Sequence, residues 1–139
     1  MTERPTSVTF FGWFFRLGGI VGMVFALPFA LWGQELLGEH WADSLHRVSP
    51  TVLFLYTFLS SLLGLLIGNG ILKGKAGART LALAYCVFAM LVAAVFYKKT
   101  ELFWANLVGN LLFTAVLGFY LFLPKASGFF RAGRVGGGP

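Results

Sequence analysis

Long apolar segments alternate with short polar ones along the whole chain. Apolar residues dominate at about 13–33, 50–72, 80–97 and 102–123, and an aromatic stretch at 9–15 precedes the first segment. A helix needs ~20 apolar residues to cross the hydrocarbon core of a bilayer, and each segment is close to that length. The pattern predicts four transmembrane helices in a single membrane domain over residues 1–139.

Proline and serine residues mark where several of these helices begin or end. Ser49 followed by Pro50 is typical of a helix cap and first turn. Pro124 cannot continue a helix, so the fourth helix should end before it. Residues 124–139 are then expected to form a cytoplasmic tail that rests on the headgroups. Pro28 lies within the first segment and predicts a bend there.

The composition agrees with a membrane protein. The chain is 58% hydrophobic and only 12% charged, which leaves too little polar surface to cover a soluble globule. Its 16 Phe, 4 Trp and 4 Tyr provide aromatic surface for lipid contact and helix packing. The fold class expected from the sequence is therefore an all-α integral membrane protein.

The basic residues predict how the chain is oriented. With both termini in the cytoplasm, most Lys and Arg residues lie inside, as the positive-inside rule requires. The topology anchors of the loop between the second and third segments are Lys73, Lys75 and Arg79. The remaining inner residues are Arg4, Arg16, Lys125, Arg131 and Arg134, and the outer ones are Arg47, Lys98 and Lys99. The net charge of +6 thus favours anionic membrane lipids as partners, and nucleic acid is not expected.

The loop at 34–49 has the pattern of a short amphipathic helix. At 100° per residue one stripe of residues 35–48 is apolar and the opposite face is polar. We expect this segment to lie on the outer membrane surface. The polar side contains His40, Asp43 and His46, which could bind a metal ion. A solvated face or a protein docking surface is the alternative.

The stretch NGILKGKA at 69–76 comes close to a phosphate-binding loop. Such a loop needs four residues between its first glycine and Gly-Lys, and a Ser or Thr after the lysine. Here the spacing is one residue short and Ala76 takes the hydroxyl position. GILKGKAGAR at 70–79 instead resembles the basic hairpin of uncharacterised small bacterial membrane proteins with four helices. The resemblance implies a four-helix fold in the bacterial inner membrane and no particular activity.

Small residues recur every four positions on two of the apolar segments. Such rows let membrane helices approach closely. They indicate which faces pack, either within this chain or against a partner subunit. The residues are Gly18, Gly22, Ala26 and Ala30 in the first segment, and Ser60, Gly64 and Gly68 in the second.

The last apolar segment has a polar face. Asn106, Asn110 and Thr114 follow one another at intervals of four and so lie on one side of a helix. Polar residues within a membrane often mark a functional pathway. They also form hydrogen bonds between helices, so this face is interpreted either as packing or as the lining of a path.

The remaining chemistry of the sequence argues against catalysis. The single cysteine, Cys86, cannot form an intramolecular disulfide, and no His, Asp or Glu lies deep in an apolar segment. Haem ligation and proton-coupled transport through a carboxylate therefore have no candidate, and no cofactor or enzymatic activity is expected. Two functions remain: an accessory subunit of a larger membrane complex, or a small homo-oligomeric transporter or channel.

Overall fold

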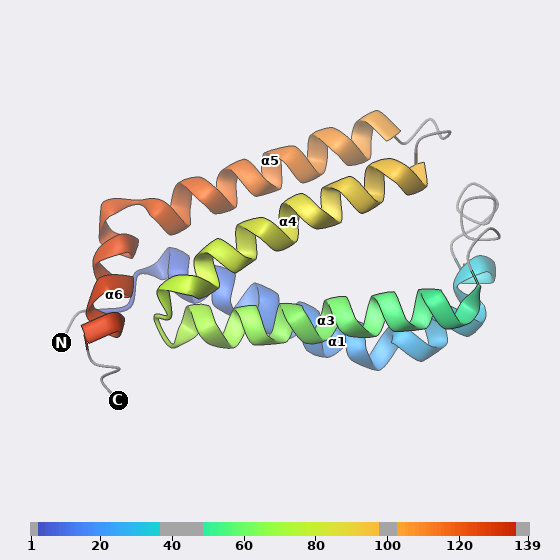
Figure 1. Cartoon of the computed structure of the whole chain (residues 1–139), viewed down its shortest axis with the longest axis horizontal. Helices are drawn as coiled ribbons and strands as arrows, with labels where there is room; N and C mark the ends of the chain where they lie inside the picture. The colour runs from blue at the N-terminus through green and yellow to red at the C-terminus, as the bar shows by residue number, and fades with distance from the viewer. Residues whose placement is uncertain (1–2, 37–48, 98–102, 136–139) are drawn as a thin grey trace.

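The fold is all-helical within the residues that the structure, a computed structural model, describes: 3–36, 49–97 and 103–135. Five helices are present there, and Figure 1 shows their arrangement. They are α1 (Thr6–Leu36), α3 (Pro50–Leu72), α4 (Ala76–Tyr97), α5 (Phe103–Phe122) and α6 (Pro124–Val135). The first four are long and apolar enough to cross a membrane, which confirms the prediction of four such helices.

The predicted signals at two helix ends are present in the structure. The hydroxyl oxygen of Ser49 accepts a hydrogen bond from the backbone N–H of Val52 at 3.3 Å, and Pro50 occupies the first helical turn. Helix α5 ends at Phe122, one residue before the bend at Leu123 that leads to Pro124. The predicted outer helix, by contrast, lies mostly at 37–48, outside the described residues, and residues 35 and 36 are the last two of α1.

The turn between α3 and α4 is a glycine-terminated helix end. Gly74 has φ +70°, a left-handed conformation that glycine adopts without strain. Its N–H donates to the carbonyl of Ile71 at 3.0 Å, and the N–H of Lys75 donates to the carbonyl of Gly70 at 2.9 Å. This pair of bonds is the Schellman motif that commonly closes a helix. The backbone of this loop therefore caps α3.

Helices α1 and α3 are packed backbone against backbone because glycines face each other across the contact. A Cβ atom added to Gly19 would lie 2.6 Å from both the carbonyl oxygen of Ser61 and the amide nitrogen of Leu65. A Cβ added to Gly68 would lie 2.7 Å from the carbonyl oxygen of Gly12. Membrane helices associate through such close contacts, because lipid tails provide no hydrophobic drive.

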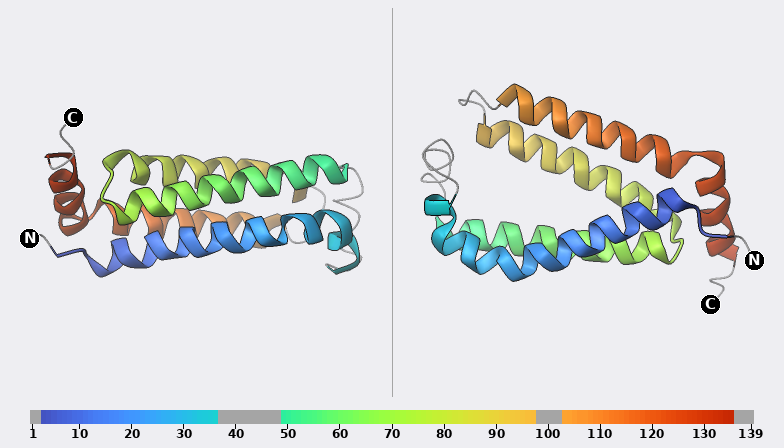
Figure 2. Two further views of the ribbon diagram at one scale, coloured as in Figure 1. Left: turned by 90° about the horizontal axis from the view of Figure 1, so that it is seen from below. Right: turned by 180° about the vertical axis from the view of Figure 1, so that it is seen from behind.

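The buried core lies in one half of the molecule. This half contains the N-terminal part of α1, the turn after α3, and α6, and we call it the terminal end; the opposite half is the loop end. The core side chains are Val8, Phe11, Phe15, Ile67, Ile71, Ala78, Ala82, Cys86, Leu117, Leu121, Ala126 and Phe130. From this core the pair α1 and α3 and the pair α4 and α5 separate toward the loop end (Figures 1 and 2).

Helix α6 runs across the terminal end of the other helices (Figure 1). Ala126 and Phe130 are fully buried, and the ring of Phe129 lies against Gly74. Small and aromatic residues at positions 126, 129, 130 and 133 form one face of the helix, because these positions lie three or four apart. The segment after Pro124, which the sequence predicts to be a cytoplasmic tail, therefore begins with a helix. Pro124 is compatible with the start of a new helix because a first-turn residue needs no N–H bond.

Candidate functional site: a cavity between the helical pairs

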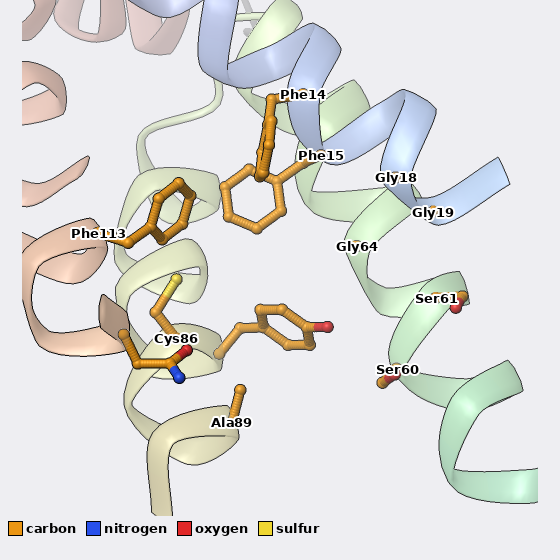
Figure 3. Close-up of a pocket in the computed structure, with 12 residues that line it drawn as sticks. Phe14, Phe15, Gly18, Gly19, Ser60, Ser61, Gly64, Cys86, Ala89 and Phe113 are labelled. Carbon is orange, nitrogen blue, oxygen red and sulfur yellow. The ribbon is translucent and has the colours of Figure 1, made fainter. Parts of the chain in front are cut away.

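A cavity of about 250 Å³ lies where the two helical pairs begin to separate (Figure 3). All four long helices contribute to its wall. Its lining residues are Phe14, Phe15, Gly18, Gly19, Ser60, Ser61, Gly64, Tyr85, Cys86, Ala89, Asn110 and Phe113. The cavity thus adjoins the core on its loop-end side, at the middle of the apolar spans.

Aromatic contacts between the pairs form one side of this cavity. The rings of Phe14 and Phe113 have centroids 5.3 Å apart, and those of Phe15 and Tyr85 are 6.1 Å apart in an edge-to-face arrangement. Such geometries are favourable for aromatic pairs. These contacts join α1 to α4 and α5, and they hold the pairs together at the depth where the cavity begins.

The cavity offers hydrogen-bonding groups without charge. Its described lining includes the hydroxyl groups of Ser60, Ser61 and Tyr85, the thiol of Cys86 and the amide of Asn110, and it includes no Lys, Arg, His, Asp or Glu. The arrangement is suited to binding an uncharged group that has both apolar and hydrogen-bonding surface.

The polar face of α5 is largely satisfied within its own helix. The amide nitrogen of Asn110 donates to the backbone oxygen of Asn106 at 2.8 Å and to its side-chain oxygen at 2.6 Å. The hydroxyl of Thr114 donates to the backbone oxygen of Asn110 at 2.8 Å. Of the three residues, only Asn110 lines the cavity. All three of these bonds lie within α5.

The structure divides the predicted small-residue rows between two places. Gly22, Ala26, Gly64 and Gly68 are at the contact of α1 with α3 or buried beside it. Gly18 is exposed and lines the cavity, and a Cβ added there would meet nothing within 4 Å.

Ser60 also lines the cavity, and its hydroxyl donates to the backbone oxygen of Thr57 at 3.3 Å.

The three topology anchors lie at the terminal end and differ in their surroundings. Lys73 and Lys75 are exposed, whereas Arg79 is half-buried between α4 and α6. The Nη1 atom of Arg79 donates to the hydroxyl of Ser127 at 3.1 Å, and its guanidinium carbon is 4.6 Å from the centroid of the Phe122 ring. Arg79 therefore holds α6 against α4 in addition to any role in orientation.

The metal candidates His40, Asp43 and His46 lie outside the described residues.

Sequence reasoning missed several residues that form the cavity. Gly19 and Ser61 lie outside the predicted rows because those rows have a strict four-residue spacing. The contact positions of α1 at 12, 15, 19, 22 and 26 alternate steps of three and four. That alternation averages 3.5 residues and keeps one face toward a neighbouring helix, whereas repeated steps of four drift around the helix. Tyr85 and Phe113 had no local signal.

No protein-family model, no curated protein and no solved structure matches this chain.

Proposed function

We propose that this chain is a non-catalytic, multi-pass accessory subunit of a larger assembly in a bacterial inner membrane, with both termini in the cytoplasm. The observation that supports this proposal best is the uncharged cavity in the opening between the two helical pairs. The occupant we propose is a transmembrane helix of another subunit, which lies in the opening and directs side chains into the cavity. A helix is ~10 Å across, so the cavity receives its side chains and not the whole helix.

Two features of the cavity favour a protein helix over lipid tails. Gly18 presents bare backbone, which allows close approach of a second helix. The hydroxyl oxygen of Ser60 and the side-chain oxygen of Asn110 can still accept a hydrogen bond, which a lipid tail cannot donate but a polar side chain can.

The test compares two glycines that are alike in the isolated chain. Gly18 and Gly109 are both exposed within a helix, and a Cβ at either would meet nothing within 4 Å. Only Gly18 lines the cavity. Gly18→Leu should therefore release the partner without unfolding the chain, whereas Gly109→Leu should leave the assembly intact.

The measurement is the native mass of the protein, extracted at endogenous level from its own membrane in a mild detergent. The proposal expects wild type and Gly109→Leu to migrate with other chains, and Gly18→Leu to migrate alone. Migration of the wild type alone would refute the accessory role. Retention of the partner by Gly18→Leu would refute the proposed docking place.

A small homo-oligomeric transporter or channel is the second candidate, because Asn110 lines the cavity and continues a polar row with Asn106 and Thr114. A discrete homo-oligomer in the same mass measurement would favour it. Replacing Asn106 and Asn110 together by Leu should then abolish flux in proteoliposomes, whereas an accessory subunit would show no flux to abolish.

A further inference from the structure

Arg79 is held in a fixed position where α4, α5 and α6 meet. Its guanidinium carbon lies 4.6 Å from the centroid of Phe122 and 5.4 Å from that of Phe130. Its Nη1 donates to Ser127, whose hydroxyl in turn donates to the backbone oxygen of Phe122 at 3.2 Å. Two aromatic faces and one hydrogen bond therefore orient the planar group before any ligand arrives.

The positive charge of Arg79 is not neutralised by the described part of the chain. A guanidinium has five N–H donors, and one hydrogen bond from it to a described residue is present. No described carboxylate lies within ion-pair distance of it. The two acidic residues of the described part are Glu3, which precedes α1, and Glu35, which belongs to the last turn of α1.

The surroundings of Arg79 add to the positive potential. Helices α4 and α6 both begin here, and neither has an acidic residue in its first turn. Helix N-termini carry partial positive charge, so acidic residues or bound anions are usually found there. Lys75 precedes α4, Lys125 is the second residue of α6, and both are exposed. The cluster formed by Arg79, Ser127, Lys75 and Lys125 is called the basic junction below.

We propose that the basic junction binds the phosphate of an anionic phospholipid in the leaflet that contains the terminal end. The guanidinium fork matches two phosphate oxygens, and the hydroxyl of Ser127 lies beside it. Phe122 ends a membrane-spanning helix and is 43% exposed, so it places apolar surface next to the cation. A phospholipid provides both a phosphate for the guanidinium and an acyl chain for the exposed ring of Phe122, whereas free phosphate provides only the first.

The experiment measures lipid retention by native mass spectrometry of the full chain released from nanodiscs. The nanodiscs contain equal amounts of phosphatidylglycerol and phosphatidylcholine. Wild type should retain phosphatidylglycerol. Arg79→Lys keeps the charge and loses the fork, so its retention should fall about tenfold, the size of one lost bidentate contact. Lys73→Gln removes an exposed charge from the same turn and should change retention less than twofold.

Three outcomes would overturn the proposal. Equal losses in Arg79→Lys and Lys73→Gln would mean diffuse attraction to the surface. Unchanged retention in Arg79→Lys would mean that the fork contributes nothing. Displacement of the lipid by millimolar inorganic phosphate would identify a free anion as the ligand.

A measurement on wild type alone covers the case in which Arg79→Lys releases α6. Amide exchange at the first turns of α4 and α6 should slow in vesicles that contain phosphatidylglycerol, relative to phosphatidylcholine alone, because a ligand of the folded state suppresses local opening. Equal exchange in both vesicles would refute the site. This inference does not depend on the proposed accessory role, since it needs no partner protein.

Discussion

Two adjacent glycines of α1 should respond oppositely to the same small substitution. A methyl group at Gly19 would lie 2.6 Å from backbone atoms of Ser61 and Leu65, which cannot rotate away. The helices would have to separate by roughly 1 Å to restore ordinary contact, and a gap of that size forfeits up to about half of the dispersion energy of the atoms involved. Gly19→Ala should therefore cost about 2 kcal/mol, within the range measured for overpacked cores.

Gly18→Ala provides the matched control. Its methyl group would meet nothing within 4 Å, and alanine is favoured over glycine inside a helix. We expect this variant to be more stable than wild type by about 0.5 kcal/mol. The assay is reversible unfolding in mixed detergent micelles, followed by the fluorescence of the four tryptophans. Equal changes in both variants, or a stable Gly19→Ala, would refute the close packing of α1 with α3.

Three further predictions concern the turn, α6 and the polar face. Gly74→Ala should destabilise the protein by about 1–2 kcal/mol in the same assay, because the φ of Gly74 is +70° and the added Cβ would approach Phe129. Its control is Gly77→Ala, whose added Cβ would meet nothing within 4 Å. Phe130→Ala should free α6, since the ring is fully buried, and faster amide exchange over residues 124–135 checks this, with the exposed Lys125→Ala as control. Asn110→Leu should change stability by less than about 1 kcal/mol, because its described bonds lie within α5, and a larger loss would reveal an interhelical bond.

Hydropathy predicted the spanning helices because their length and apolar character are set by the bilayer itself. It did not predict α6, because residues 124–135 are too short and polar to resemble a span. The signal was nevertheless present in the spacing of Ala126, Phe129, Phe130 and Gly133, which is the spacing of one helix face. Pro124 cannot continue α5, and it is equally a good first residue for α6.

The cavity was predictable only in part. Ser60, Gly18 and Asn110 were all singled out by their character, yet as members of three separate patterns. These three residues line one cavity because of the way in which the two helical pairs cross. That crossing follows from aromatic pairs such as Phe14 with Phe113, which are far apart in sequence. A single sequence contains no local signal for such a pairing.

The two halves of the molecule differ in how completely their described residues bury one another. At the terminal end, aromatic rings, the capped turn and α6 enclose the core, and only the charge of the basic junction calls for an external ligand. Beyond the cavity the pairs separate, and few of the described residues there are buried, Ala26 and Leu53 among them. A partner that entered the opening would therefore bury apolar surface without disturbing the core.

Because the basic junction lies in the other half, Gly18→Leu should release the partner and leave phosphatidylglycerol retention unchanged, and Arg79→Lys should do the reverse. Loss of both ligands in either variant would show that the two halves are coupled through the aromatic contacts between them.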